Sequence, residues 1–206
     1  MAAIYLRRSV TGQATFSLFV RMLPGGRGFL VAAGLADCLQ FLEDFSFTPD
    51  ELSYLRQTQG YGEETLRAFA GLRFTGEVRA VPEGRVVFAG EPLLEVTAPI
   101  AEAQLAETVL LNHVTFQTAV ATKAARCVLA AGGAQLVDFS FRRTQGIDAG
   151  FAVARAGAIA GFAATSNVAA ARRDGLAAAS TMAHSFIEAF GDEQRRSPRS
   201  PRTSPA

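Results

Sequence analysis

A long helical run constrains the fold of this chain more than any other feature of its sequence. Apolar or small residues recur at helical spacing from Glu102 to Ala131, and Gly132-Gly133 then stops the pattern. The positions that share this spacing are Leu105, Val109, His113, Phe116, Val120, Ala124 and Cys127. The sequence therefore predicts one long helix over 102–131, and a first domain, residues 1–133, that ends just after it.

Two β-rich segments precede the predicted helix. In 15–34, apolar stretches flank Pro24-Gly25-Gly26, and because glycine accepts a positive φ, we predict a hairpin with its turn there. A glycine-rich loop that cradles a phosphate beside Arg27 is the alternative, although such loops normally open a helix. In 76–99, β-favouring residues alternate with Pro-Glu-Gly and Ala-Gly-Glu-Pro turns, which indicates a small antiparallel meander.

Two shorter helices are predicted between these β segments. Leu35, Leu39 and Leu42 have the spacing of one apolar helix face. Thr48 starts a capping box that runs to Glu51, with a proline at the first helical position, so a second helix is expected to begin there. Together with the β segments, these helices predict an α+β N-terminal domain.

After Gly133 the pattern changes to strands alternating with helices. Three units are predicted, each a short strand followed by a helical stretch. Their ranges are 135–141 with 148–159, 162–165 with 167–173, and 177–183 with 185–190. This order is typical of α/β proteins with parallel strands, and a closed barrel would need eight units. We therefore predict an α/β protein with an incomplete, irregular (β/α) barrel over 134–191, and a disordered Arg/Ser/Pro-rich tail over 192–206.

Charge and cysteine content argue against several classes of function. The formal net charge is +1, so no overall positive field favours nucleic acid or a membrane surface, and a small-molecule partner is expected. Cys38 and Cys127 form no CxxC pair, which argues against a disulfide framework or a zinc site and fits a reducing cytoplasm. No signal peptide or membrane-spanning stretch is predicted.

Candidate functional side chains follow the predicted strands. Barrel enzymes carry their active residues where strands end and loops begin, and 140–146 and 180–185 are such places. One of the neighbours Arg142 and Arg143 can enter the barrel mouth and bind a carboxylate or phosphate, while the other packs or pairs outside. His184 stands between a strand and a helix, a setting suited to nucleophilic or proton-transfer chemistry.

Other polar residues have both a structural and a functional interpretation. Thr165-Ser166-Asn167 ends another predicted strand, where it caps a helix or contacts a phosphate. His113 lies on the apolar helix face with no second ligand at metal spacing, which favours a core histidine over a metal ligand. Lys123 and Arg126 form a solvated or interface face of the same helix, with an anion site as the alternative.

A series of sequence blocks carries the most specific signal. In chain order they are FSLFVRMLPGGRGFLVAAGL, YLR, FTGEVRAVPEG, EPLLEVTAPIAEAQLAETVLLN, FQTAVATKAAR, VDFSFRRTQGIDAG, GFAATSNVAAA and STMAHSF. These blocks, spread over residues 12–191, closely resemble the nicotinate phosphoribosyltransferase family. The resemblance implies a phosphoribosyltransferase-type barrel, of which this chain would be an N-terminal portion truncated at both ends.

The resemblance also implies a reaction and the residues that serve it. Nicotinate would be joined to 5-phosphoribosyl 1-pyrophosphate, giving nicotinate mononucleotide and pyrophosphate with coupled ATP hydrolysis, as the entry to NAD salvage. Mg²⁺ is the implied cofactor, ATP the co-substrate and a homodimer the implied assembly. Arg142 would bind the nicotinate carboxylate, and His184 would be phosphorylated by ATP. Further implied contacts are Phe141, Ser180, Thr181, Ser185, Thr165, Ser166 and Asn167 for substrate, and Arg143, Lys123 and Arg126 for anions.

Two other interpretations stay open. In the first, the polypeptide is a catalytically inactive remnant that at most dimerises, because open parallel strands leave unpaired edges and an uncovered apolar face. In the second, it serves another pyridine substrate, since quinolinate requires more positive charge than nicotinate and nicotinamide requires none. Arg142, as one cationic fork, favours a pyridine with a single carboxylate.

Overall fold

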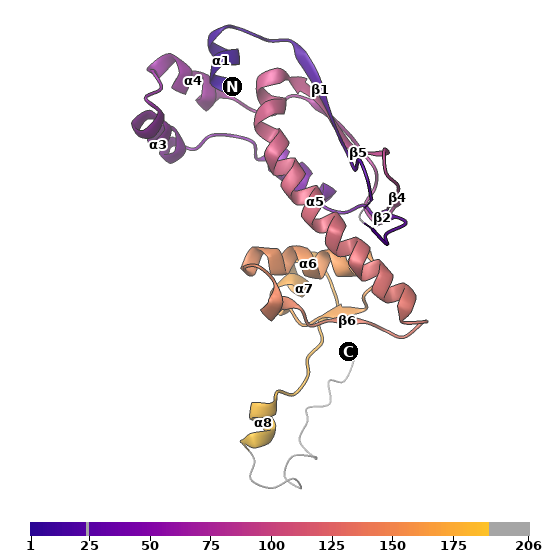
Figure 1. Cartoon of the computed structure of the whole chain (residues 1–206). Coiled ribbons are helices and arrows are strands. Elements are labelled where there is room, and N and C mark those ends of the chain that lie inside the picture. Colours follow the sequence, from indigo (N-terminus) through magenta and orange to yellow (C-terminus); the bar gives the residue numbers. More distant parts are fainter. Residues whose placement is uncertain (24, 190–206) are drawn as a thin grey trace.

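The computed structural model describes residues 1–23 and 25–189, so the predicted tail at 192–206 lies outside the described residues. Helix α5 (Ile100–Ala130) runs through the molecule and carries structure at both of its ends. One end contacts an antiparallel sheet and the helices α1 (Ala2–Arg7) and α2 (Leu35–Glu43), and the other contacts α6 (Ile147–Ile159) (Figure 1). The long helix predicted from its apolar spacing is therefore present, two residues longer at its start and one shorter at its end.

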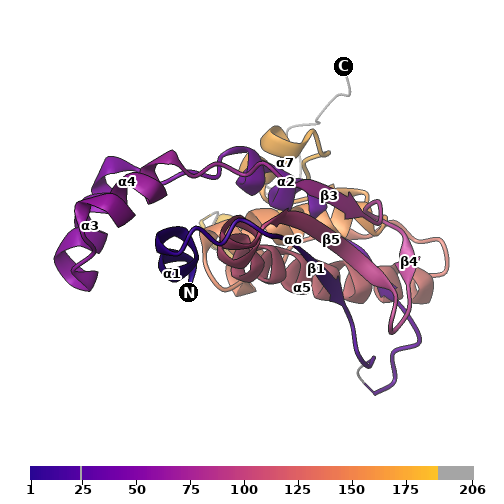
Figure 2. The ribbon, with the colours of Figure 1, turned by 90° about the horizontal axis from the view of Figure 1, so that it is seen from above.

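The N-terminal layer is a three-stranded antiparallel sheet in the order β1-β5-β3. Its strands are β1 (Gln13–Phe19), β3 (Glu77–Ala80) and β5 (Pro92–Pro99). Seen from above in Figure 2, this sheet lies over α5. Its exposed face is polar, with Thr15 hydrogen-bonded to Thr97 at 2.8 Å and Ser17 donating to Glu95 at 2.7 Å.

The predicted hairpin over 15–34 is wrong. Strand β1 pairs with β5, and β2 (Leu30–Val31) pairs instead with β4 (Val86–Val87) in a separate two-stranded sheet. The reason is burial, because the β1–β5 register sets Phe16 opposite Val96 and Leu18 opposite Leu94, pairs that a local hairpin would not provide. The predicted meander is only partly correct: β3 and β5 are antiparallel neighbours, but β4, which lies between them in sequence, pairs with β2.

The buried row of α5 lies one position away from the predicted apolar face. Ala103, Ala106, Leu110, Val114 and Ala121 are fully buried, whereas six of the seven predicted positions are only half-buried and Ala124 alone is buried. Small side chains at 103, 106 and 121 let the neighbouring layers approach the helix axis closely. Since α5 contacts a sheet on one side and α6 on the other, it has two apolar stripes, and spacing alone did not separate them.

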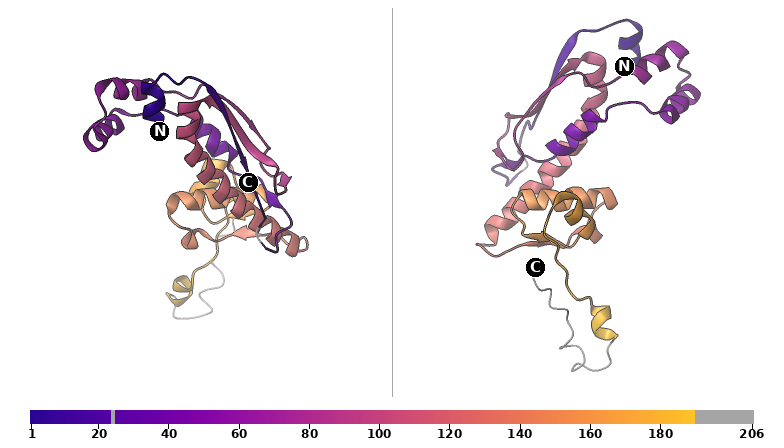
Figure 3. Two further views of the ribbon diagram at one scale, coloured as in Figure 1. Left: turned by 45° about the horizontal axis from the view of Figure 1, so that its top comes forward. Right: turned by 180° about the vertical axis from the view of Figure 1, so that it is seen from behind.

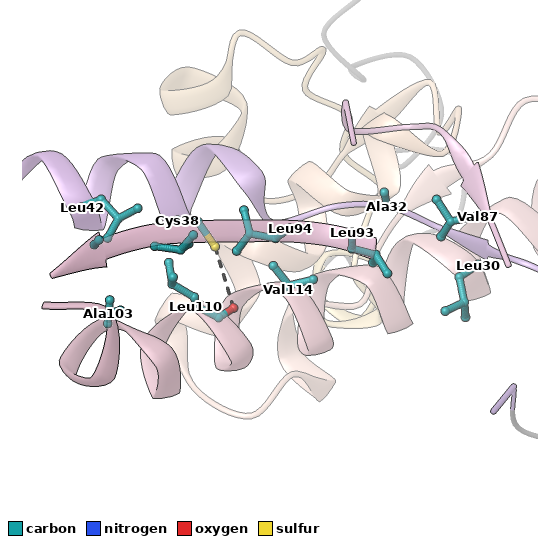
Figure 4. Packing of buried hydrophobic residues seen from close by; sticks show 13 residues of the cluster. Leu30, Ala32, Cys38, Leu42, Val87, Leu93, Leu94, Ala103, Leu110 and Val114 are labelled. Atoms are coloured by element: carbon teal, nitrogen blue, oxygen red, sulfur yellow. Dashed lines mark hydrogen bonds between the residues drawn. The ribbon is translucent and has the colours of Figure 1, made fainter. Parts of the chain in front are cut away.

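The core between the sheet and α5 is built from aliphatic side chains and one thiol. Figure 4 shows Leu42, Leu94, Leu110 and Val114 pointing into this layer, with the Cys38 thiol donating to the Leu110 carbonyl at 3.8 Å. Burial, with smaller contributions from the carboxylates of Asp37 and Glu83, raises the pKa of Cys38 to about 12. This thiol therefore stays protonated at neutral pH and acts as a small apolar residue.

The predicted short helices are present. They are α2 (Leu35–Glu43) and α3 (Pro49–Gln59), and both bonds of the Thr48–Glu51 capping box are formed. In α2 the buried residues are Cys38 and Leu42, whereas Leu39 is 40% exposed, so the predicted apolar face is only partly correct. Helices α1 (Ala2–Arg7) and α4 (Glu63–Gly71) pack around Phe45 and Phe69 in a second cluster.

The C-terminal part contains parallel strands linked by helices, in the predicted order. Strand β6 (Val137–Asp138) pairs with β7 (Ala164–Thr165), and Ala178 forms a further parallel bridge to Thr165. The helices are α6 (Ile147–Ile159), α7 (Val168–Asp174) and α8 (His184–Glu188), with a 3₁₀ turn η1 at Phe141–Arg143. The strands are shorter than predicted, and α8 lies apart from α6 and α7 in both views of Figure 3.

An ion pair between Glu83 and Arg155 links the C-terminal part to the N-terminal part of the chain. Glu83, in the turn after β3, accepts a 2.7 Å hydrogen bond from the Gly34 amide and forms a two-bond ion pair with Arg155 of α6. Burial alone raises the pKa of the Glu83 carboxyl, but hydrogen bonds from Arg155 and from the Gly34 and Ala36 amides outweigh burial and lower it. Glu83 is therefore ionised in the folded protein at neutral pH.

None of the helices over the described ranges 1–23 and 25–189 is both long and apolar enough to cross a membrane.

Candidate active site

A cavity of about 530 Å³ lies at the carboxyl ends of the parallel strands. Ligands of α/β proteins bind at this edge, because loops from successive strands converge there and expose backbone and side-chain polar groups. The volume lies within the range of ordinary small-molecule sites. The residues that line the cavity are Phe139, Phe141, Arg142, Ser166, Thr181, Met182, Ala183 and His184.

Five residues predicted from sequence meet at this cavity: Phe141, Arg142, Ser166, Thr181 and His184. Arg142 belongs to η1, just beyond β6, and its guanidinium has no ion pair or hydrogen bond with any described residue. A forked, permanently charged donor group that the chain itself leaves unpaired is suited to a carboxylate or phosphate. His184 is the first residue of α8, and its exposed imidazole is likewise without a hydrogen bond to the described residues.

The remaining predicted contacts lie outside the cavity. Ser180 and Ser185 are exposed but do not line it, and Arg143 points to solvent from η1. Lys123 and Arg126 lie on the exposed side of α5, in agreement with the prediction that they form a solvated face of this helix. Of the two adjacent arginines, only Arg142 reaches the cavity, although both stand on a 3₁₀ turn rather than on a strand.

His113 is not a core histidine, and that prediction is wrong. It is half-buried and lines a second cavity of about 620 Å³ beside Asp37, Gln117, Asp148 and Arg173. The prediction failed because it used the stripe of α5 that faces this cavity instead of the row that faces the sheet.

Thr165 and Asn167 are structural in their described contacts. They are 1% and 6% exposed and do not line the cavity, while Ser166 between them does. Asn167 is the N-cap of α7 and accepts from the Ala170 amide at 3.1 Å, so the capping interpretation is confirmed. The Thr165 hydroxyl accepts from the Asn167 amide at 3.1 Å and donates to Asp138 at 2.9 Å.

Two residues near the site were missed from the sequence. Phe139 lines the cavity, and Asp138, the residue before it, is 6% exposed and is not part of the lining. The Asp138 carboxylate accepts hydrogen bonds from the Ser140 amide at 2.9 Å, the Ser140 hydroxyl at 2.6 Å and the Thr165 hydroxyl. An acidic residue directly after an apolar strand was the available signal, because a buried carboxylate is stable only where donors surround it.

The ring of Phe141 packs against a glycine, Gly150. A Cβ added to Gly150 on α6 would stand 2.2 Å from the ring of Phe141, so only glycine allows this ring to lie against α6. The 3₁₀ turn that carries Arg142 therefore packs directly on the helix that follows it.

The cavity fits an organic anion better than a protein-bound metal. No carboxylate lines it, both oxygens of Asp138 are already hydrogen-bonded, and no group of three metal-ligating side chains occurs within the described residues. The residues here thus do not provide the carboxylate oxygens that Mg²⁺ prefers, and no chemical step is assigned to the ion. One cation, two hydroxyls, an imidazole and two phenyl rings suit a flat aromatic acid or a phosphate.

Solved structures define the class of protein. The chain superposes on the human nicotinic acid phosphoribosyltransferase with a TM-score of 0.84 at 37% identity, covering 92% of this chain and 39% of that one. It also matches a nicotinate-nucleotide pyrophosphorylase from Pyrococcus furiosus in fold, with a TM-score of 0.75 at 22% identity, covering 95% of this chain and 42% of that chain. Fold and cavity together define a phosphoribosyltransferase-type α/β protein.

Sequence comparison gives the family. The profile of the nicotinate phosphoribosyltransferase (NAPRTase) N-terminal domain matches residues 1–115. A nicotinate phosphoribosyltransferase of Mycobacterium tuberculosis is 50% identical over 94% of this chain and 42% of its own length, and that of Bacillus subtilis is 44% identical over 94% and 40%. The chain belongs to the nicotinate phosphoribosyltransferase family, and it spans about two fifths of the length of these relatives.

Proposed function

We propose that the protein joins nicotinate to 5-phosphoribosyl 1-pyrophosphate, forming nicotinate mononucleotide and pyrophosphate in NAD biosynthesis. The observation that carries this proposal is the unpaired guanidinium of Arg142 in a cavity at the carboxyl ends of parallel strands. Membership of the family supports the choice of nicotinate, since a single arginine fork matches one carboxylate.

The residues of the cavity suggest a division of roles. Arg142 binds the nicotinate carboxylate, and the phenyl rings of Phe139 and Phe141 offer flat surfaces for the pyridine ring. The pyridine nitrogen then attacks the anomeric carbon of the ribose, while the bond from that carbon to pyrophosphate breaks and pyrophosphate leaves with the electron pair. The hydroxyls of Ser166 and Thr181 donate to phosphate oxygens.

Several parts of the proposal come from the family resemblance alone. ATP phosphorylates His184 in a coupled step, and the enzyme works as a homodimer in the cytoplasm. Mg²⁺, for which the described lining of the cavity offers no carboxylate, would be supplied together with the pyrophosphate substrate. The strands β6, β7 and the bridge at Ala178 are the first strands of a (β/α) barrel, with the boundary between the two domains near residue 133. Ser180, Ser185, Arg143, Lys123 and Arg126 stay candidate contacts at the edges of that site.

The test uses the native gene product that contains this sequence, with its intact mass measured first. Nicotinate mononucleotide formation is assayed with nicotinate, 5-phosphoribosyl 1-pyrophosphate, Mg²⁺ and ATP. Nicotinamide, an amide, and quinolinate, a diacid, are then tested as substrates in place of nicotinate. We expect nicotinate to be preferred, and Arg142→Met to lower its kcat/KM about a hundredfold, because the nicotinate carboxylate would lose its charged donor. Arg143→Met, the adjacent arginine outside the cavity, serves as the control and should change little.

The second candidate is a catalytically inactive chain that at most dimerises. It is favoured by the apolar side chains left exposed on the C-terminal part, among them Val137, Met182 and Phe186 at 37%, 57% and 40%. Absence of product from both wild type and His184→Asn would establish that candidate. Product formation silenced by His184→Asn would exclude it.

A further inference from the structure

We infer that Asp138 is a positioning residue of the anion site, which fixes the Arg142 turn and the Ser166 turn at their working separation. The inference rests on the proposed function for its choice of ligand, but its geometry is independent of that choice. Asp138 ends β6, and the two cavity walls that carry Arg142 and Ser166 begin immediately after β6 and β7.

The first wall is attached to Asp138 through Ser140. One carboxylate oxygen accepts from the Ser140 amide at 2.9 Å and from the Ser140 hydroxyl at 2.6 Å. Ser140 directly precedes the 3₁₀ turn Phe141–Arg143, so these two bonds set the direction in which the chain enters the turn. Phe139 and Phe141, on either side of Ser140, both line the cavity.

The second wall is attached through Thr165. The other carboxylate oxygen accepts from the Thr165 hydroxyl at 2.9 Å, and that hydroxyl accepts from the Asn167 amide at 3.1 Å. The backbone carbonyl of Asp138 accepts from the Ser166 amide at 2.8 Å. One residue therefore holds both ends of the turn that presents Ser166 to the cavity.

The negative charge of Asp138 by itself disfavours a bound anion. A carboxylate beside an anion site repels the ligand, and by Coulomb attraction alone its removal should strengthen binding. A carboxylate retained there, 6% exposed and bonded to three donors, is explained by the geometry it imposes on both walls. Positioning and electrostatics thus predict opposite effects of Asp138→Asn on anion affinity.

The first readout is nicotinate affinity, measured by titration of the folded protein. We expect Asp138→Asn to weaken nicotinate binding about tenfold, because the arginine fork is displaced from its productive geometry. Asp148→Asn is the matched control, since it removes the same charge from an exposed residue outside this cavity. Tighter binding in Asp138→Asn than in this control would overturn the inference, as would equal binding.

A second pair of variants keeps the carboxylate and removes its partner. Thr165→Val deletes the hydroxyl that joins β7 to Asp138, and Thr165→Ser preserves it. We expect the valine variant to weaken nicotinate binding and the serine variant to restore it. Equal affinity in both variants would contradict the inference, and this pair decides the question if Asp138→Asn does not fold.

The second readout does not depend on the ligand. Amide hydrogen exchange at Ser140 and Ser166 should become about tenfold faster in Asp138→Asn, while amides of α5 keep their rates. If the wild-type protein binds no nicotinate, the proposed function fails, and the exchange rates alone decide whether Asp138 holds the two walls. Unchanged exchange at both amides would refute the positioning role whatever the activity.

Discussion

At the scale of single residues, the Glu83 carboxylate joins parts of the chain that are far apart in sequence. It connects the Gly34 amide at the start of α2 to Arg155 on α6, so one side chain links three segments distant in sequence. The side chains of Glu83 and Arg155 are only 17% and 20% exposed, and solvent therefore screens this pair weakly. A surface pair such as Arg79–Glu77, at 76% and 66%, lacks that protection.

Replacing Glu83 by glutamine should destabilise the protein. The change leaves the Arg155 guanidinium nearly buried without its counter-charge, and we expect a loss of about 3 kcal/mol in the free energy of unfolding. Urea denaturation followed by circular dichroism measures this loss. Glu77→Gln, the matched change in an exposed pair, should cost less than about 0.5 kcal/mol. Equal losses in the two variants would show that the Glu83–Arg155 pair stabilises the fold no more than an exposed pair does.

The same pair predicts a dependence of stability on pH. Because the folded-state pKa of Glu83 lies below the ordinary value of 4.5, its contribution is complete above pH 4.5 and is lost as the pH falls through the lowered pKa. The stability difference between wild type and Glu83→Gln should thus be constant near neutrality and shrink as the pH falls below 4.5 and through the lowered pKa of Glu83. A difference that grows on acidification would be inconsistent with this sign.

At the scale of elements, helices were easier to predict than strand partners. The capping box at Thr48 and the Gly132-Gly133 stop are local signals, and both helices begin or end within two residues of the expected positions. The partner of β1 is encoded 82 residues away, where Thr15 meets Thr97, and no local turn signal reports it. The turn at Gly25-Gly26 favoured a hairpin, but pairing with β5 buries more apolar surface.

A small element, β2, depends on α5 for its hydrogen bonds. The Val31 amide donates to the Thr122 hydroxyl at 2.9 Å, and the Ala33 amide donates to the Thr118 hydroxyl at 3.2 Å. Threonine in the middle of a helix usually indicates little from sequence alone. Here two of them, one helical turn apart, accept hydrogen bonds from the backbone amides on the side of this segment that faces away from β4.

Thr122→Val should therefore destabilise the fold by about 1–3 kcal/mol, since it leaves the Val31 amide buried without an acceptor. Thr115→Val on the same helix is the control, because its hydroxyl is exposed and donates to the Leu111 and Asn112 carbonyls of its own helix and to no other element. Thermal unfolding of both variants provides the comparison. Similar midpoints for the two would show that the Thr122 bond to β2 is dispensable.

At the scale of the whole molecule, exposed apolar side chains occur at both ends of α5. The N-terminal sheet turns a largely polar face to solvent, with Phe19 at 47% as an exception, and the C-terminal part exposes apolar side chains between 37% and 70%. These are Val137, Phe139, Phe141, Ile147, Val168, Met182 and Phe186. The alternation of strands and helices predicted the C-terminal order correctly. Position after a strand was enough to place Arg142 and His184 at the cavity, whereas the hydrogen bonds that join Asp138 to two segments are visible only in the folded chain.

This exposed apolar surface predicts self-association of the 206-residue polypeptide. We expect the sedimentation coefficient to rise with concentration and an apolar dye to bind, because patches of this kind are seldom left uncovered in monomers. The double variant Phe139→Ser/Met182→Ser should reduce both effects. Leu129→Ser, which removes one exposed leucine of α5, is the control and should leave them unchanged. A wild-type chain that stays monomeric and binds no dye would contradict this expectation.

The pairing of β1 with β5 also bears on how the chain is made. The ribosome adds about 5–20 residues per second, so β1 is complete roughly 4–16 s before its partner has been synthesised. During that interval Phe16 and Leu18 belong to an apolar strand whose edges are both open to chaperones and to other nascent chains. The pace of translation, more than any property of β1 itself, determines how long this segment can find a wrong partner.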